Sequence, residues 1–202
     1  MIVIIDYKMG NLRSIKKAFD SLEVESIISS NYIDILKADK LVLPGVGFFK
    51  QGMENIKSRG LVEPLNNAVL EKKIPILGIC LGMQLLTNYS EEGDCQGLGW
   101  VDSNTKKFSF ENGGYKIPHI GWNNLITKKN SPLFNGINVD NYFYFVHSYF
   151  ISCKNEEDIL CETLYGHLFV SSFNKGNIYG TQFHPEKSHD AGLLLLKNFV
   201  VI

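Results

Sequence analysis

Three short segments of this chain are apolar at nearly every position, and they constrain its fold more than any other feature. They lie at residues 2–5, 40–43 and 74–79, and residues 24–28 form a fourth strand candidate. A strand that is covered on both faces needs no polar side, so its sequence is a continuous apolar run. The runs therefore predict a buried sheet of parallel strands.

The segments between these strands carry apolar residues at helical spacing. Asn11 is a candidate N-cap for the first helix. Its apolar face consists of Leu12, Ile15, Phe19 and Leu22. Further helical patterning covers residues 33–37, residues 50–72 with a break near Gly60, a segment that begins at Leu81, and residues 190–200. Strands that alternate with helices are typical of α/β proteins, in which helices flank a parallel sheet.

Beyond Trp100 the chain changes to short segments that combine Gly, Asn and aromatic residues. Such segments predict antiparallel strands. They lie at residues 115–126, 141–150, 159–165, 168–173 and 177–183. A chain of 202 residues buries enough surface for one stable hydrophobic core. We therefore expect one α/β domain over residues 1–202, with a mostly parallel central sheet flanked by helices and an antiparallel extension.

The charge of the chain is nearly balanced, with 20 Lys and Arg against 21 Asp and Glu. Nucleic acids and anionic membranes favour basic proteins, so we expect neither as a partner. The sequence contains no run of about 18 apolar residues that would span a bilayer. The apolar start Met1–Asp6 ends in a carboxylate and has no basic segment, which is unlike a signal peptide. We expect a cytoplasmic protein.

Four cysteines stand at positions 80, 95, 153 and 161 without a CxxC pair. This spacing indicates neither a zinc site nor a disulfide framework, and no His, Asp or Glu cluster has the spacing of metal ligands. We therefore expect no metal and no cofactor. Cys95, Cys153 and Cys161 have no neighbouring base in the sequence and are interpreted as incidental.

Cys80 lies in the sequence Gly78-Ile79-Cys80-Leu81-Gly82, between an apolar strand and a helical pattern. The flanking glycines allow a tight turn that lifts the sulfur above the end of the strand, as in a nucleophile elbow. The N-terminus of the following helix favours the thiolate. An isolated cysteine is more often a small buried hydrophobic residue, but this spacing at a strand-to-helix junction favours a nucleophile.

A thiolate nucleophile needs a base, and His184 follows the apolar strand 178–181. His184 and Glu186 are two residues apart, so in an extended segment they share a face. Glu186 is therefore predicted to orient the imidazole as the third member of a catalytic triad. A lone H-x-E triplet is weak evidence, but it gains weight beside the cysteine elbow.

The glycine-rich segment Pro44-Gly45-Val46-Gly47 follows the strand at 40–43. It allows a backbone N–H to face the cysteine, and we predict an oxyanion hole from the N–H groups of Gly47 and Leu81. By itself this segment would be an ordinary turn. However, it stands with Cys80 and His184 at the carboxyl ends of expected parallel strands, where open α/β sheets build their sites.

Seven motifs, spread over nearly the whole chain, carry a family resemblance. They are Asp6-Tyr7 with Gly10-Asn11-Leu12, Pro44–Gly47, Gly78–Gln84, Ser90–Gly93, Pro118–Asn123, Phe145–Tyr149 and Phe183–Ser188. With them the sequence resembles the class I glutamine amidotransferases, and more narrowly the glutaminase subunits of imidazole glycerol phosphate synthases. The resemblance implies that Cys80 attacks the carboxamide carbon of glutamine, that His184 protonates the departing ammonia, and that water releases glutamate from the thioester.

The same resemblance implies how the glutamine substrate is held. Gln84 and Glu92 would contact it, and the backbone around Ser148 and Tyr149 would hold its amino-acid end. From the residues alone, Gln84 could instead be structural and Glu92 could belong to a solvated turn. His147 and His167, which lie in strand-like segments, are expected to be hydrogen-bonded core residues.

A partner subunit is also implied by the resemblance, because ammonia must stay unprotonated to react and the 202 residues leave no room for an acceptor domain. The partner would be a separate (β/α) barrel cyclase that makes imidazole glycerol phosphate and an aminoimidazole carboxamide ribonucleotide in histidine biosynthesis. The resemblance places His119, Trp122, Asn123 and Lys187 at this heterodimer interface. From the residues alone, the segment around Trp122 could be an aromatic turn and Lys187 an ordinary exposed lysine.

Several alternatives stay open at this point. Lys8 and Ile120 depart from the family pattern near the partner motifs. A related glutaminase subunit could thus supply ammonia to another acceptor, such as an enzyme that adds an amidino group to a surface-glycan sugar. A stand-alone thiol hydrolase and a catalytically silent binding subunit are further alternatives, and the intact set of Cys80, His184 and Glu186 disfavours the silent one.

Overall fold

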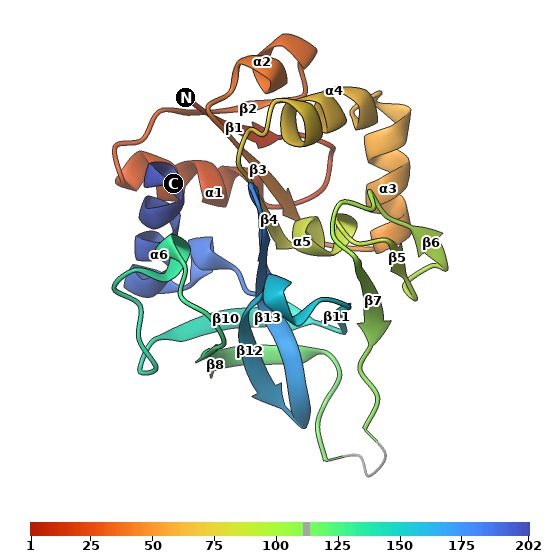
Figure 1. Ribbon diagram of the computed structural model, residues 1–202, viewed down its shortest axis with the longest axis vertical. Helices are drawn as coiled ribbons and strands as arrows, with labels where there is room; N and C mark the ends of the chain where they lie inside the picture. The colour runs from red at the N-terminus through yellow and green to blue at the C-terminus, as the bar shows by residue number, and fades with distance from the viewer. Residues whose placement is uncertain (111–113) are drawn as a thin grey trace.

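Five parallel strands form the centre of the structure, a computed structural model that describes residues 1–110 and 114–202 (Figure 1). They lie side by side in the order β2 (Ser26–Ser29), β1 (Ile2–Ile5), β3 (Lys40–Gly45), β4 (Ile76–Cys80) and β14 (Ile178–Thr181). Each neighbouring pair is parallel. Parallel strands bring their carboxyl ends to one edge, so the loops that follow β3, β4 and β14 meet there.

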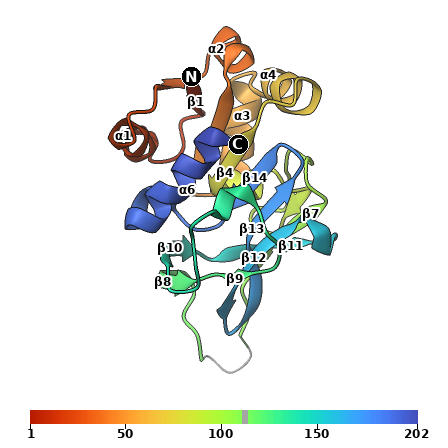
Figure 2. The same cartoon turned by 60° about the vertical axis from the view of Figure 1, so that its left-hand side comes forward.

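Helices cover both faces of this parallel sheet (Figure 2). One face carries α1 (Leu12–Ser21) and α6 (His189–Val201). The other carries α2 (Tyr32–Lys37), α3 (Phe49–Ser58), α4 (Val62–Asn66) with a π-helical continuation (Asn67–Glu71), and α5 (Leu81–Leu85). Within β1, Ile4 packs in the cluster with α1 and α6, and Ile5 packs on the opposite face. No helix within the described residues is both long and apolar enough to cross a membrane.

The other strands extend the sheet beyond β14, mostly in antiparallel pairs. In order they are β13 (His167–Lys175), β11 (Tyr149–Cys153), β7 (Ser103–Lys107), β5 (Tyr89–Ser90) and β6 (Cys95–Gln96), with β12 (Ile159–Tyr165) beside β13 and β9 (Ile126–Thr127) beside β12. A separate antiparallel pair joins β8 (His119–Asn124) to β10 (Tyr142–His147). Three 3-10 turns in the described chain lie at Pro132–Phe134, Glu156–Asp158 and Pro185–Lys187.

The predicted α/β architecture is confirmed, and Gly60 separates α3 from α4 as expected. The prediction for residues 177–183 is wrong in part, because β14 pairs in parallel with β4 and antiparallel only with β13. Strand β7 was not predicted, because its sequence is polar throughout. Only alternate residues of β7, Ser103 and Thr105, are buried, and neither is apolar.

Helix α5 lies very close to the strands beside it. A Cβ atom added at Gly82 would lie 1.7 Å from the Leu43 carbonyl oxygen, and one added at Gly78 would lie 2.8 Å from Met83 backbone atoms. Side-chain carbons do not approach backbone atoms this closely. Glycine at these two positions therefore allows α5 to settle against β3 and β4, and this contact sets where the first turn of α5 begins.

We expect Gly82→Ala to lower the free energy of unfolding by at least about 2 kcal/mol, because the new methyl group must displace the β3 backbone. Urea unfolding followed by circular dichroism measures this change. Gly114→Ala is the matched control, since a Cβ there meets nothing within 4 Å. Equal stability losses in the two variants would contradict the proposed close contact.

Candidate active site

The turn from β4 into α5 has the geometry of a nucleophile elbow. Cys80 has φ 54° and ψ −111°, a backbone conformation that side chains with a Cβ rarely adopt. The residue is buried, and its thiol donates a 3.9 Å hydrogen bond to the Val146 carbonyl oxygen. The tight turn expected from the flanking glycines is thus present, with Cys80 at its apex.

His184 and Glu186 lie in the loop after β14, which neighbours β4 in the sheet. His184 Nδ1 lies 2.8 Å from Glu186 Oε1, and both side chains are only 2% exposed. The predicted contact between His184 and Glu186 is present, but it does not arise from an extended segment as predicted. Residues Pro185–Lys187 form a 3-10 turn and not an extended segment, so this turn brings Glu186 back to the imidazole.

The proton positions at His184 follow from its partner. A carboxylate only accepts, so Nδ1 carries the hydrogen and Nε2 is left as the basic nitrogen. Nε2 is buried and makes no hydrogen bond to any described residue. Burial alone would lower the pKa of His184, but the negative charge of the Cys80 thiolate and the contact with Glu186 raise it to about 10. A negative charge on the Cys80 sulfur therefore stabilises the protonated form of His184.

A pocket of about 420 Å³ opens beside Cys80. It is lined by Val46, Gly47, Cys80, Leu81, Gln84, Glu92, Pro118, Val146, His147, Ser148, Tyr149 and Lys187. The lining residues include Gly47 and Leu81, which are predicted to form the oxyanion hole. They also include all four residues that are predicted to hold glutamine: Gln84, Glu92, Ser148 and Tyr149. Within the described residues, no group of three or more His, Cys, Asp or Glu is placed to hold a metal ion.

Two of the pocket's polar side chains also hold neighbouring elements. Gln84, on α5, donates a 3.1 Å hydrogen bond to the Tyr149 carbonyl oxygen. Glu92 accepts a 2.8 Å hydrogen bond from the Phe49 N–H, and so caps the first turn of α3. Burial raises the pKa of Glu92, and the Phe49 hydrogen bond opposes this in part. Glu92 therefore links the position of α3 to the pocket wall.

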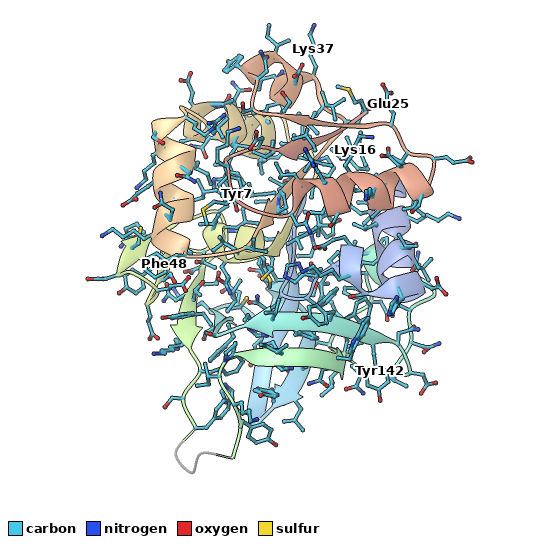
Figure 3. All side chains as sticks on the ribbon, turned by 180° about the vertical axis from the view of Figure 1, so that it is seen from behind. Tyr7, Lys16, Glu25, Lys37, Phe48 and Tyr142 are labelled. Atoms are coloured by element: carbon cyan, nitrogen blue, oxygen red, sulfur yellow. The ribbon has the colours of Figure 1, made fainter. Side chains whose placement is uncertain are left out.

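The glycine-rich segment after β3 is tied to the first loop of the chain. The Tyr7 hydroxyl donates a 2.6 Å hydrogen bond to the Pro44 carbonyl oxygen. Figure 3 shows Tyr7 within the body of the molecule and Phe48 near its edge, in agreement with their exposed fractions of 0% and 48%. Burial, together with the charge at Cys80, raises the pKa of Tyr7. Tyr7 is therefore a neutral donor that fixes the start of the predicted oxyanion segment.

Three of the residues predicted at the partner interface lie on or near the surface, but His119 does not. Trp122 is 45% exposed and its ring stacks on that of His189, while the Lys187 ammonium lies 5.6 Å from the centre of the Tyr144 ring. Asn123 is half-buried and donates to the Leu164 carbonyl oxygen. His119 is only 3% exposed, which contradicts the surface contact predicted for this residue.

His119 instead belongs to a buried pair with His147. His119 Nδ1 lies 3.0 Å from His147 Nε2, and His147 Nδ1 lies 2.7 Å from the Tyr149 carbonyl oxygen. That carbonyl only accepts, so His147 carries its hydrogen on Nδ1 and His119 donates to His147 Nε2. Burial lowers the pKa of His119 to about 4 and that of His147 to about 3. His147 is thus the hydrogen-bonded core residue that its strand pattern predicted.

Two residues at the site had no assigned role in the sequence analysis. Tyr7 stood in a family motif, but nothing in the sequence indicates a contact with Pro44 across 37 positions. Gln182 is completely buried, and its Nε2 lies 3.6 Å from Cys80 Sγ. Its position two residues before His184 at the end of a strand was a usable signal, because such residues share a face.

Comparison with known proteins identifies the family of the chain. A profile described as glutamine amidotransferase class-I matches residues 3–202. The chain belongs to the class I glutamine amidotransferases. It is 51% identical to "Imidazole glycerol phosphate synthase subunit HisH 1" of Campylobacter jejuni subsp. jejuni serotype O:23/36 (strain 81-176), with 98% of each chain covered. It is 43% identical to subunit HisH 2 of Pseudomonas aeruginosa, with 99% of this amidotransferase and 98% of the relative covered.

Solved structures share the fold of this amidotransferase. A crystal structure titled as a glutamine amidotransferase has a TM-score of 0.76 at 18% identity, covering 99% of this chain and 100% of that one. The structure of PurLQS from Thermotoga maritima has a TM-score of 0.73 at 16% identity, and the match covers 99% of this chain and 97% of that one. At such identities the likeness concerns the fold alone.

The histidine pair predicts that acid destabilises this amidotransferase. The lowered pKa values mean that, between pH 6.5 and about 4, the unfolded chain binds protons that the folded chain excludes. The free energy of unfolding should therefore decrease as the pH falls through this window. His119→Asn retains a hydrogen-bond donor and removes one titrating group, so urea unfolding across these pH values should show a shallower dependence. An unchanged dependence would contradict the role of the pair.

Proposed function

We propose that this amidotransferase is a glutaminase subunit that hydrolyses glutamine to glutamate and ammonia. It passes the ammonia to a separate cyclase subunit that makes imidazole glycerol phosphate and an aminoimidazole carboxamide ribonucleotide in histidine biosynthesis. The observation that carries the proposal is the set of Cys80, His184 and Glu186 at one sheet edge, beside a pocket of about 420 Å³. The names of relatives that are 39% to 51% identical over nearly the full chain support the pathway.

Residues 1–202 act as one glutaminase domain in this proposal. We propose that the protein acts in the cytoplasm. The four cysteines stand as free thiols, which suits a reducing compartment.

The first half of the reaction forms a thioester. His184 Nε2 removes the proton from the Cys80 thiol, and the thiolate attacks the carboxamide carbon of glutamine. The backbone N–H groups of Gly47 and Leu81, both in the pocket wall, stabilise the oxyanion that forms. The imidazolium then gives its proton to the amide nitrogen, the C–N bond breaks, and ammonia leaves. Glu186 holds the ring in place and stabilises its positive charge.

The second half releases glutamate. His184 removes a proton from a water molecule, whose oxygen attacks the thioester carbon. The carbon–sulfur bond breaks, glutamate leaves, and Cys80 recovers its proton. The balance is glutamine and water to glutamate and ammonia.

The surface beside the pocket supports docking of the synthase subunit. Ile120, Trp122 and Tyr142 on the β8–β10 pair are 59%, 45% and 55% exposed. Pro118 and Lys187 line the pocket next to this pair. An exposed apolar patch is typical of an interaction surface. A partner seated here would cover the mouth of the pocket, so ammonia could pass to it without entering bulk water.

We expect Cys80→Ala to reduce glutamine-dependent synthesis by the paired enzymes at least about 1,000-fold, because the nucleophile is lost. Ammonium salts should restore synthesis, since the cyclase then receives ammonia from solution. Product formation with glutamine and with ammonium measures both effects. Cys95→Ala is the control, because the Cys95 thiol is only partly buried and its one hydrogen bond among the described residues is to the adjacent Gln96 carbonyl oxygen. A failure of ammonium to rescue would indicate that Cys80 acts in folding or docking.

We also expect the cognate cyclase with its nucleotide ligand to raise glutamate release at least about ten-fold, the range of coupling between linked sites. Glutamate release by the purified chain, alone and with the cyclase, measures this. Stimulation by a different acceptor enzyme, with none by the cyclase, would retain the glutaminase assignment and refute the histidine pathway.

A further inference from the structure

Gln182 connects the two functional parts of the pocket, although its side chain does not line it. It follows β14 and is 0% exposed. Its Nε2 donates to Cys80 Sγ at 3.6 Å, and its Oε1 accepts from Gln84 Nε2 at 2.9 Å. One side chain thus contacts both the nucleophile and a predicted substrate-binding residue.

The Tyr149 carbonyl oxygen settles the orientation of the Gln84 amide, because a carbonyl oxygen only accepts. The two hydrogens of its NH₂ group have two acceptors, the Tyr149 carbonyl oxygen at 3.1 Å and Gln182 Oε1 at 2.9 Å. Both hydrogens of the NH₂ group are therefore occupied, and no residue that the structure describes donates a hydrogen bond to Oε1 of Gln84. Since Gln84 lines the pocket, this oxygen is available as an acceptor for an ammonium group of a ligand.

The orientation of the Gln84 amide in turn settles that of Gln182. Its Oε1 must face the Gln84 NH₂ group, so its own NH₂ group faces the sulfur. An N–H donor stabilises a thiolate more than a thiol, because hydrogen bonds to charged groups are the stronger ones. The Val146 carbonyl oxygen, 3.9 Å from the sulfur, favours the protonated thiol instead. Gln182 therefore opposes Val146 at the nucleophile.

We propose that Gln182 assists the reaction in two ways: it donates a hydrogen bond that stabilises the Cys80 thiolate, and it holds Gln84 with Oε1 toward the substrate. The second role rests on the proposed glutaminase function, whereas the first concerns the thiol alone. Gln182 is thus a further catalytic residue through its contact with sulfur, and a positioning residue through Gln84.

Two variants separate these roles. Gln182→Met retains most of the volume and removes both hydrogen bonds. Gln182→Glu retains an acceptor for Gln84 and removes the NH₂ donor to sulfur. Thr181→Val is the matched control, because Thr181 is equally buried at the end of β14, directly before Gln182, and its hydroxyl donates only to the Phe183 carbonyl oxygen among the described residues.

The rate at which iodoacetamide alkylates Cys80, measured by mass spectrometry from pH 5 to 10, reports the thiolate without any substrate. We expect the rate near neutral pH to fall at least about five-fold in both Gln182 variants and to keep its wild-type value in Thr181→Val. The KM for glutamine, measured with the synthase partner, should rise about ten-fold in Gln182→Met and less than about two-fold in Gln182→Glu.

Unchanged alkylation in both variants would overturn the thiolate role, and an unchanged KM in Gln182→Met would overturn the positioning role. If both variants fail to fold, as judged by thermal melting, Gln182 is a core residue and the proposal is wrong. A wild-type Cys80 that resists alkylation near neutral pH would count against the proposed glutaminase function itself, and so is distinguishable from these outcomes.

Discussion

The contact between Gly82 of α5 and the Leu43 carbonyl of β3 leaves no room for a side chain. Because α5 starts this close to the sheet, the chain must turn at Cys80, the last residue of β4, and Cys80 takes a positive φ to do so. The strained residue is then held in place by packing on both sides. The position of the sulfur is therefore set by backbone contacts, and the surrounding polar groups act on a sulfur atom that is already fixed.

The order of strands in the sheet brings the rest of the site to this sulfur. Strand β14 lies directly beside β4, so the segment from Gln182 to Glu186 leaves the sheet next to Cys80. On the other side, β3 leads into the segment that Tyr7 holds by its hydroxyl group. The proposed nucleophile, the proposed base and the predicted oxyanion donors thus come from three neighbouring strand ends.

Much of this arrangement could be predicted from the sequence. The apolar runs indicated the parallel strands, because strands buried on both faces need uniform composition. The glycines around Cys80 indicated the elbow, because few residues tolerate that turn. Strand β7 was not predicted, because its residues are polar and two of them are buried only through packing against neighbouring strands. The contacts of His119 with His147 and of Gln182 with Cys80 were not predicted either, because the partners lie 28 and 102 positions away in the sequence.

The place of β14 in the sheet has a consequence for synthesis of the protein. This strand is the last in sequence, yet it lies between β4 and β13, both made before it. Contacts between distant segments form late in folding, since long loops must close first. A growing chain on the ribosome therefore carries Cys80 without His184, its proposed base, until the C-terminal segment has emerged. Under the proposed mechanism, an unfinished chain therefore cannot hydrolyse glutamine.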